Sequence, residues 1–460
     1  MKARNRVGRA AESSTRRGFL GGAAATLAGS SASAAVLKPT VSARSASRVV
    51  GANDRINLGL IGVGIRGSGH LRKLVERSEA ARDVQPVAAC DVYTRWKQRA
   101  KAIAKLEDKD IFNDYRELVA RNDVDAVLIA TPDHWHAQIA IDAMAAGKDV
   151  YLEKPMTLTI AEARQVAEAA AKQGKVLEIG SGGVSDPRNK KARELIEGGE
   201  IGDLLWAQTS MGRYIPHGDW NYFVDEEATP ESIDWRRWLG SAPKRAFSAE
   251  RFFRWRKYWD YSGGIATDLY YHSLGPILYA MGGQYPTRVV GAGGIYVHQN
   301  REVPDTYATI IEYPKFYIVV SGTQANAAPG KYMPRIIYGS KGTLRYEEKS
   351  VVIEPEASQR GRGRAKPEPK VHEAGPYDIW ATHMEDFLKC MRTREKPNLD
   401  GDLGYRIMVA IRMGVDSYRT GTVAFFDAGQ QKVVRSGPAR PAYEGKGENY
   451  PEEFGRARGA

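Results

Sequence analysis

Apolar and polar positions alternate in a regular rhythm through residues 54–179. Short apolar runs are separated by longer stretches in which apolar positions recur with helical spacing, as at 137–146 and 161–172. The apolar runs have the length of buried strands and lie at 56–61, 87–90, 124–130, 149–152 and 175–179. Strands that alternate with helices indicate a parallel, doubly wound sheet. We therefore expect an α/β domain over residues 54–179.

A different pattern follows residue 180. Longer runs rich in β-branched and aromatic residues come without intervening helical stretches, which favours consecutive strands of one sheet. These runs lie at 204–209, 306–312, 316–322, 335–338 and 342–346. Helical spacing returns at 379–392 and 405–420, and residues 354–374 form a polar excursion. We expect residues 180–430 to form an α+β substrate and oligomerisation domain with a large open mixed or antiparallel sheet, followed by a tail at 431–460.

The first 53 residues differ in composition from the rest of the chain. Residues 14–20 read Ser-Thr-Arg-Arg-Gly-Phe-Leu, a twin-arginine export signal, and a weakly apolar stretch and small residues follow. We expect a signal peptide at 1–34 with cleavage near Ala34, a linker at 35–53, and export to the periplasm by the twin-arginine machinery. The apolar stretch is too short to remain in a membrane, so we expect no integral membrane segment. A disordered basic tail is the alternative interpretation.

Most of the net positive charge of the chain lies in this first segment. The formal charge is +12, but residues 1–53 hold nine Lys and Arg against one Glu, which leaves +4 for the rest. Nucleic-acid binding would need a basic face on the folded body, and the densest remaining basic run, 360–367, contains glycines and a proline that favour a solvated loop. We expect no nucleic-acid partner. The two cysteines, Cys90 and Cys390, are too few for a disulfide framework.

The strongest local signal is a glycine turn after the first strand. Gly62, Gly64 and Gly67 have the spacing G-x-G-x-x-G between the apolar run at 56–61 and a helix expected to start near Ser68. The first glycine permits the tight turn, the second lets the backbone approach a pyrophosphate, and the third lets helix and strand pack closely. The phosphates then lie at the helix N-terminus. This arrangement predicts a dinucleotide site.

The strand at 87–90 bears on the choice of dinucleotide. It ends at Asp91, where a carboxylate can accept hydrogen bonds from the adenosine ribose. A carboxylate repels a 2′-phosphate, so the sequence favours NAD. Arg95, four residues later, leaves NADP open as the alternative.

Glu153-Lys154-Pro155 follows the strand at 149–152, at the sheet edge where open α/β sheets bind their ligands. Lys154 can donate a hydrogen bond to a reacting hydroxyl and stabilise developing negative charge. Pro155 stiffens the loop that holds it. A surface acid and base pair is the alternative for this segment.

Asp268 and His272 form a second candidate pair. Four residues apart, they share one face if the segment is helical. His272 can take a hydroxyl proton while hydride leaves the same carbon, and Asp268 can set its tautomer and basicity. Pro276 is expected to disrupt the helix at the His272 carbonyl. A pair on the helix surface, without catalytic function, is the alternative.

Six of the nine tryptophans lie between Trp206 and Trp259. Most of these rings are expected in the core or in a dimer contact, but aromatic faces also stack on sugars. Because they lead into the Gly263-Gly264 turn, we expect substrate contacts from Tyr258, Trp259 and Tyr261. Four arginines of this region could bind hydroxyls or carboxylates, namely Arg236, Arg237, Arg254 and Arg256. His134 and His136 suggest a metal by their spacing, but no third ligand stands nearby, so we expect no metal.

These motifs together resemble the glucose-fructose oxidoreductase, inositol dehydrogenase and MocA (Gfo/Idh/MocA) family. The resemblance rests on the glycine turn, on residues 130–136 and 153–155, and on Gly263-Gly264 followed by Asp268 and His272, and it covers the body to about Asp427. It implies a Rossmann domain, a second domain with a large open sheet, and oxidation or reduction of sugar or cyclitol hydroxyls. It also implies catalytic roles for Lys154, Asp268 and His272. The implied cofactor-binding residues are Gly62, Gly64, Ile65, Arg66, Gly67, Asp91, Thr131, Pro132, His136, Glu153 and Lys154.

The resemblance leaves the reaction class open. An export signal resembles the family's exported branches, which hold their cofactor tightly. One such branch is an α-N-acetylgalactosaminidase-like glycosidase that oxidises a sugar transiently with bound NAD, and residues 272–276 resemble it. Asp268 four residues before His272 is the dehydrogenase pattern, so we expect an NAD(P)-dependent sugar or cyclitol dehydrogenase. A non-catalytic sugar or nucleotide sensor is a third interpretation. The large sheet predicts a homodimer or homotetramer.

Overall fold

The structure is a computed structural model that describes residues 55–357 and 367–437. These residues belong to one compact unit. The expected signal peptide and linker, most of the basic run at 360–367, and the tail from 438 on lie outside the described residues. The expected boundary at residues 179–180 falls at the end of the last strand of the first sheet, Leu177–Gly180, and remains a prediction as a domain boundary.

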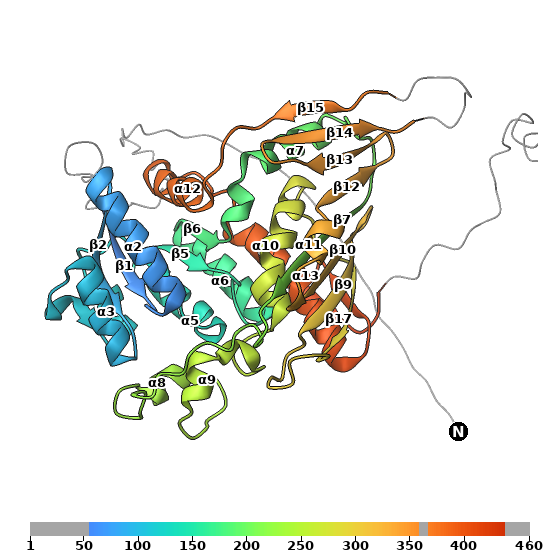
Figure 1. Cartoon of the computed structure of the whole chain (residues 1–460). Coiled ribbons are helices and arrows are strands. Elements are labelled where there is room, and N and C mark those ends of the chain that lie inside the picture. Colours follow the sequence, from blue (N-terminus) through green and yellow to red (C-terminus); the bar gives the residue numbers. More distant parts are fainter. Residues whose placement is uncertain (1–54, 358–366, 438–460) are drawn as a thin grey trace, which may run out of the picture. The chain divides into compact units, whose positions relative to one another are not determined.

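The first sheet is parallel and six-stranded, with the order β3-β2-β1-β4-β5-β6. Chain order reverses between β1 and β4, where Leu60 pairs with Leu128. The carboxyl ends of these two strands therefore form the switch point at which doubly wound sheets bind ligands. The strands are β1 (Ile56–Ile61), β2 (Val84–Cys90), β3 (Ile111–Phe112), β4 (Ala126–Ile129), β5 (Asp149–Glu153) and β6 (Leu177–Gly180). Figure 1 shows this sheet in blue to green.

Helices and short turns connect these strands, as the alternating pattern predicts. They are α2 (Ile65–Ala80), α3 (Thr94–Ala104), η1 (Asp108–Asp110), α4 (Tyr115–Val119), α5 (Asp133–Ala145) and α6 (Ile160–Gln173). The first helix starts at Ile65, before the expected Ser68, so Gly67 lies within its first turn. A capping box of Thr159 and Glu162 fixes the start of α6.

The second sheet has eleven strands in the order β15-β14-β13-β12-β7-β10-β9-β8-β16-β17, with β11 paired to β7. It is mixed, because β10 runs parallel to β7 while its other neighbour β9 is antiparallel. The expected polar excursion at 354–374 includes one of these strands, β15. The strands are β7 (Leu204–Tyr214), β8 (Arg288–Gly294), β9 (Thr306–Glu312), β10 (Tyr317–Thr323), β11 (Ala325–Asn326), β12 (Ile336–Gly339), β13 (Gly342–Tyr346), β14 (Ser350–Pro355), β15 (Lys370–Glu373), β16 (Ala424–Asp427) and β17 (Lys432–Val434).

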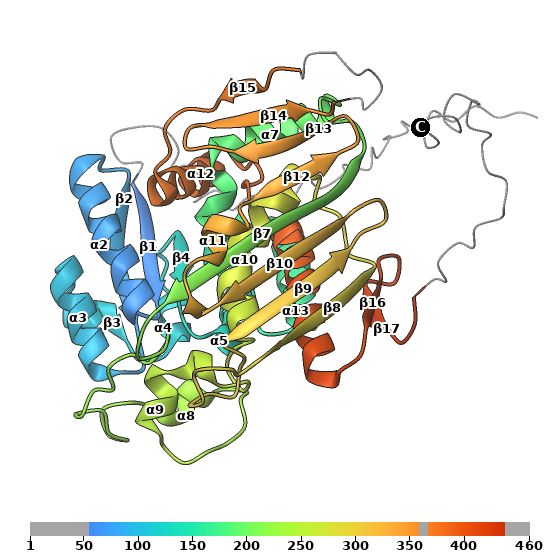
Figure 2. The ribbon, with the colours of Figure 1, turned by 45° about the vertical axis from the view of Figure 1, so that its right-hand side comes forward.

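Helices cover one face of this large sheet (Figure 2). They include α7 (Pro187–Glu197), α10 (Ile265–Ala280) and α13 (Gly401–Thr420). The expected disruption of α10 at Pro276 is wrong, since the helix continues to Ala280. Its burial stabilises it even though Pro276 cannot donate to the His272 carbonyl. The remaining elements are η2 (Gly182–Ser185), α8 (Trp235–Leu239), α9 (Ala249–Phe253), η3 (Trp255–Lys257), α11 (Pro329–Tyr332) and α12 (Ile379–Thr393).

An aromatic cluster joins the segment around α8 and α9 to the loop after β2. Tyr93 packs edge-on against Phe252, and Trp235 stacks on Trp238. The backbone of Tyr93 also pairs with Ile233 in an isolated bridge. Three of the six tryptophans of this region, Trp220, Trp235 and Trp238, are thus buried in the core. Over residues 55–357 and 367–437, no helix has both the length and the apolar character needed to cross a membrane.

Candidate active site

A cavity of about 1180 Å³ opens at the carboxyl ends of β1, β2, β4 and β5. Its walls come from the glycine turn and the β4–α5 turn on one side, and from β7, η3 and α10 on the other. This volume exceeds the usual 300–1,000 Å³ of a small-molecule pocket. The cavity therefore has room for a large ligand and a second, smaller one.

Only glycine fits at two positions of the turn. A Cβ at Gly67 would lie 1.9 Å from the Gly62 carbonyl oxygen. Gly62 has φ +86°, and a Cβ there would lie 2.8 Å from the backbone of Ala130 and Thr131. The tight turn predicted at the first glycine and the close packing predicted at the third are therefore observed. Gly67 acts by this packing and is not among the residues that line the cavity.

The start of α2 faces the cavity with free backbone donors. Its N-cap is Gly64, with no side-chain cap and no acidic residue in the first turn. Ile65 is 66% exposed and Arg66 also lines the cavity. Thr131 Oγ, buried in the opposite turn, has no hydrogen-bond partner. An anion at the helix start and a polar ligand beside Thr131 fit these groups, as a dinucleotide provides.

Asp91 lines the cavity but is tied to the backbone. Its carboxylate accepts hydrogen bonds from Val63 N at 2.7 Å and from Tyr93 N at 2.9 Å. Burial raises the pKa of Asp91 to about 6 despite these two donors. Each carboxylate oxygen can still accept a second hydrogen bond, so the expected ribose contact remains a prediction. Asp91 also holds the glycine turn to the loop after β2.

Arg95, which left NADP open, is held by another carboxylate. Its Nη1 lies 2.8 and 2.7 Å from the two oxygens of Asp225. Arg95 is not among the described residues that line the cavity. Its contacts favour NAD, because this guanidinium is already paired. Arg99, on α3, is a basic residue that does line the cavity.

Of the remaining residues expected to bind the cofactor, some line the cavity and one supports the loops behind it. Thr131 and Pro132 line the cavity, whereas His136 is 1% exposed and lies behind it. The His136 ring nitrogens lie 2.7 Å from the Pro155 carbonyl and 2.8 Å from the Thr131 carbonyl. His136 thus braces the loops after β4 and β5 against each other. His134 instead contacts the Trp238 carbonyl, and no group of three metal-ligating side chains exists within the described ranges.

Glu153 lies at the cavity end of β5, between two partners. It accepts a hydrogen bond from Arg66 Nε at 2.7 Å and contacts His70 Nε2 at 2.6 Å. Burial would raise the pKa of Glu153, but Arg66 and His70 hold it well below its usual range. Glu153 is therefore an anion that orients Arg66 near the start of α2.

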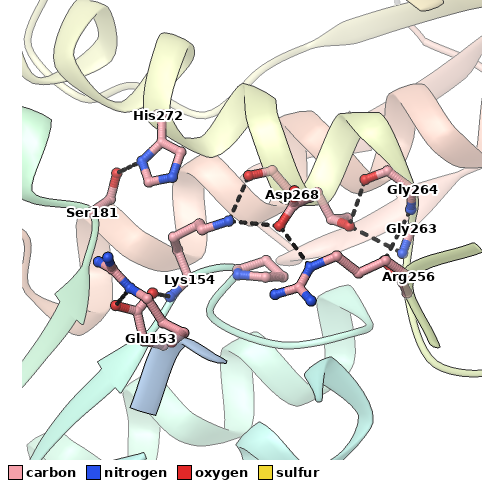
Figure 3. A network of polar contacts seen from close by, with 12 residues as sticks. Glu153, Lys154, Ser181, Arg256, Gly263, Gly264, Asp268 and His272 are labelled. Atoms are coloured by element: carbon pink, nitrogen blue, oxygen red, sulfur yellow. Dashed lines mark hydrogen bonds and ion pairs between the residues drawn. The ribbon is translucent and has the colours of Figure 1, made fainter. Parts of the chain in front are cut away.

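Lys154 and Asp268 meet in the cavity from the two halves of the chain (Figure 3). Lys154 Nζ donates to Asp268 Oδ1 at 2.8 Å and to the Asp268 carbonyl at 2.6 Å. Arg256 Nε also donates to Oδ1, at 3.1 Å. Burial opposes ionisation of Asp268, but these two cations hold its pKa well below its usual range. The carboxylate is thus ionised between them.

His272 finds its hydrogen-bond partner at the end of the parallel sheet. Its Nδ1 lies 3.2 Å from Ser181 Oγ, at the end of β6, and no hydrogen bond joins it to Asp268. Asp268 pairs instead with Lys154 and Arg256, and it acts on the imidazole through space by raising its pKa. That Asp268 tunes His272 remains a prediction. Burial and the Lys154 ammonium lower the pKa of His272 to about 3. The imidazole is neutral at pH 7, and within residues 55–357 and 367–437 no hydrogen bond engages its Nε2.

The expected aromatic substrate contacts lie away from the cavity. Tyr258, Trp259 and Tyr261 are absent from its described lining. Tyr261 is fully buried beside Trp238, and Trp259 packs near Tyr418. Burial explains the position of Tyr261, and the predicted substrate contacts of the three rings are not found at this cavity.

Other aromatic and basic side chains form this wall instead, namely Tyr222, Phe223, Trp255, Arg213 and Arg256. Trp255 and Arg256 lie within the region whose aromatic and basic character pointed to sugar binding. Ser181, Arg213 and Tyr222 have no local sequence signal. They join the site through β6, β7 and the loop after β7.

Comparison with protein families identifies both halves of the chain. A model described as an oxidoreductase family with an NAD-binding Rossmann fold matches residues 56–181. A model described as the C-terminal α/β domain of that oxidoreductase family matches residues 213–357. The two matches together span more than half of the 460 residues.

Curated relatives include two kinds of enzyme. Inositol 2-dehydrogenase of Salmonella typhimurium is 34% identical over 179 residues, which are 39% of this chain and 50% of that protein. A glycosyl hydrolase family 109 protein of Shewanella baltica is 27% identical over 315 residues, which are 65% of this chain and 58% of that protein. The chain thus spans about half the length of the curated relatives it matches.

Solved structures share the fold. Levoglucosan dehydrogenase in complex with NADH has a TM-score of 0.61 at 19% identity, covering 80% of this chain and 98% of that one. Aldose-aldose oxidoreductase from Caulobacter crescentus has a TM-score of 0.60 at 18% identity, covering 81% and 100%. With both domain models matched in order, the chain belongs to the Gfo/Idh/MocA family of oxidoreductases, whose N-terminal domain is an NAD-binding Rossmann fold.

Proposed function

We propose that this protein is an NAD-dependent dehydrogenase that transfers a hydride between a sugar or cyclitol hydroxyl and the nicotinamide. The observation that carries the proposal is that Lys154 and His272 both line the cavity that the glycine turn also lines. Inositol 2-dehydrogenases among the relatives support the substrate class.

The two side chains have complementary chemistry. In the oxidation direction, the carbon–hydrogen bond supplies a hydride, the hydroxyl gives up its proton, and a carbonyl forms. NAD supplies the hydride acceptor. The Lys154 ammonium stabilises negative charge that develops on the substrate oxygen. The neutral His272 accepts the hydroxyl proton at Nε2, while Ser181 holds Nδ1.

Substitution of His272 tests this assignment. His272→Ala is expected to bind NAD with wild-type affinity, because the glycine turn is untouched, and to lose nearly all turnover. Binding is measured by calorimetry and turnover by NADH absorbance with a panel of sugars and cyclitols. Turnover retained in His272→Ala would contradict the proposed role of His272 as the general base.

A second candidate function is a glycosidase that uses bound NAD catalytically. The glycosyl hydrolase family 109 relatives favour it, since they match 65% of this chain. Purified protein incubated with glycosides and no added cofactor distinguishes the two. Free sugar without accumulating NADH supports the glycosidase, and stoichiometric NADH supports the dehydrogenase.

We further propose that NAD is preferred over NADP and is held tightly. The paired Arg95 supports the first point. Export supports the second, because the proposed twin-arginine route moves folded proteins and the periplasm supplies little nucleotide. The mass and absorbance spectra of nucleotide released from purified protein test both points. Protein purified without nucleotide would contradict tight binding.

The twin-arginine signal predicts release into the periplasm with cleavage near Ala34. Cell fractionation and N-terminal sequencing of the mature chain test this proposal. A substitution of Arg16 and Arg17 by Lys is expected to keep the protein in the cytoplasm. Export that persists in this variant would contradict the twin-arginine route.

We also propose a homodimer or homotetramer. Apolar residues on the strands of the large sheet support it, because Leu205, Val290, Ile310 and Tyr317 are 40–49% exposed. Light scattering on the eluting protein measures the mass directly, and a monomer at micromolar concentration would contradict this proposal.

A further inference from the structure

Arg256 presents an unused fork of hydrogen-bond donors to the cavity. Its Nε donates to Asp268, and its guanidinium lies 4.1 Å from the centre of the Trp255 ring. These contacts hold the guanidinium from two sides. Its two terminal nitrogens have no hydrogen-bond partner among the described residues, although the side chain is only 22% exposed. A mostly buried charge with unpaired donors costs free energy, unless a ligand accepts hydrogen bonds from those donors.

Positive charge exceeds negative charge around this fork. Lys154 and Arg256 share the single carboxylate of Asp268, and Arg213 lies within electrostatic range of the same group. Arg213 has a second partner in Asp219, at 3.2 Å, but its side chain is 42% exposed and lines the cavity.

A second acidic residue, Asp133, does not neutralise this excess of positive charge. Asp133 is 2% exposed, and its Oδ2 has no hydrogen-bond partner. Burial raises the pKa of Asp133 to about 8, although Arg256 and Lys154 lie near enough to lower it. Asp133 is therefore largely neutral at pH 7, and this end of the cavity retains a net positive charge. The Tyr222 hydroxyl, also within range of Arg213 and Arg256, adds a neutral donor.

Arg256 lies across Lys154 from Glu153, although it remains within electrostatic range of Arg66 at the start of α2. In Figure 3, Arg256 and Asp268 lie on the opposite side of Lys154 from Glu153, which orients Arg66 near the start of α2. The phosphates have their own donors at the glycine turn. The fork of Arg256 instead lies beside Lys154, where the reacting oxygen binds.

We infer that the substrate carries a carboxylate that binds the free terminal nitrogens of Arg256, so that it is a sugar acid rather than a neutral sugar. A planar guanidinium with two parallel donors matches a carboxylate in a bidentate pair. Arg213 and the Tyr222 hydroxyl border the same space and complete the anion site. This inference rests on the proposed dehydrogenase function and specifies its substrate.

Binding of matched sugars to the NADH-saturated protein tests the inference without requiring turnover. Calorimetry compares D-glucuronate with D-glucose, and D-galacturonate with D-galactose. At least one acid is expected to bind tenfold or more tightly than its neutral partner. Equal affinity within each pair would overturn the inference. Tighter binding of D-glucose 6-phosphate than of either uronate would also overturn it, in favour of a phosphate.

Variants of Arg256 test whether its two terminal nitrogens cause the preference for acidic over neutral sugars. Arg256→Gln is expected to reduce the acid-to-neutral affinity ratio at least tenfold, and Arg256→Lys, which keeps the charge but not the fork, to reduce it partly. Arg236→Gln is the matched control, since Arg236 is exposed outside the cavity. An unchanged ratio in both Arg256 variants would overturn the inference. Absence of NADH formation from every sugar, with the binding preference intact, would instead contradict the proposed function.

Discussion

Lys154 and Asp268 are 114 residues apart in sequence, yet the Lys154 ammonium lies 2.8 Å from the Asp268 carboxylate. One stands at the end of a strand of the parallel sheet and the other in the first turn of α10. Their ion pair joins the two halves of the chain at the cavity. Asp268 therefore fixes the position of the Lys154 ammonium, in addition to its electrostatic effect on His272.

Removing the Lys154 ammonium is expected to slow the reaction strongly. Lys154→Met should lower kcat by about 10²–10³-fold, the usual loss for one group that stabilises an oxyanion, while the Kd for NAD changes little. Lys154→Arg retains a cation and is expected to keep more activity than Lys154→Met. Steady-state kinetics and calorimetry measure both values, and equal activity of the two variants would argue against an electrostatic role.

Ser181 is expected to position His272. Ser181→Ala removes one neutral hydrogen bond, worth about 1 kcal/mol, so kcat should fall by roughly fivefold with NAD affinity unchanged. The pH profile of kcat should also shift, because the imidazole loses its Nδ1 partner, and Ser181→Thr should restore both. A change confined to thermal stability would contradict the positioning role.

The glycine turn predicts a stability effect together with a binding effect. In Gly67→Ala, the new Cβ meets the Gly62 carbonyl at 1.9 Å, so α2 must shift away from the turn. We expect a loss of about 1–3 kcal/mol in unfolding free energy and much weaker NAD binding. Gly330→Ala is the control, since its Cβ meets nothing within 4 Å. Wild-type NAD affinity in Gly67→Ala would contradict the prediction that this close packing is needed for NAD binding.

Asp133 gives the stability of the protein a defined pH dependence. Its pKa is raised from 3.8 to about 8 in the folded state, so its contribution to stability is full below pH 4 and is lost as the pH rises through 8. Asp133→Asn cannot ionise and should be more stable than the wild type at pH 9 by more than about 1 kcal/mol, with no advantage at pH 4. Denaturant unfolding at the two pH values measures this, and a pH-independent difference would contradict it.

Cofactor selectivity should respond to the partner of Arg95. Asp225→Asn weakens the ion pair and leaves the Arg95 guanidinium, near the end of β2, with its 3.3 Å contact to Glu227, so NADP affinity should rise several-fold while NAD affinity stays the same. The double variant Asp225→Asn, Arg95→Gln should lose this gain. Competition binding with the two nucleotides tests the prediction, and a gain that survives in the double variant would exclude Arg95.

Local sequence determined the nucleotide half of this protein. Alternating strand and helix patterns, the spacing of Gly62, Gly64 and Gly67, and Lys154 at a strand end each follow from neighbours in the chain. These features depend on contacts between residues that are close in sequence, so they could be predicted from the sequence. The boundaries were less exact: α2 starts three residues early because Gly67 permits a tight first turn.

Tertiary structure alone decided the partners across the cavity. Asp268 and His272 share a helix, but the Asp268 carboxylate pairs with Lys154 and Arg256, and the imidazole is hydrogen-bonded to Ser181. Burial drew Tyr261 into an aromatic cluster and left Tyr222 and Arg213 at the wall. Such outcomes depend on charges and apolar surfaces brought together from distant segments, which no local pattern specifies.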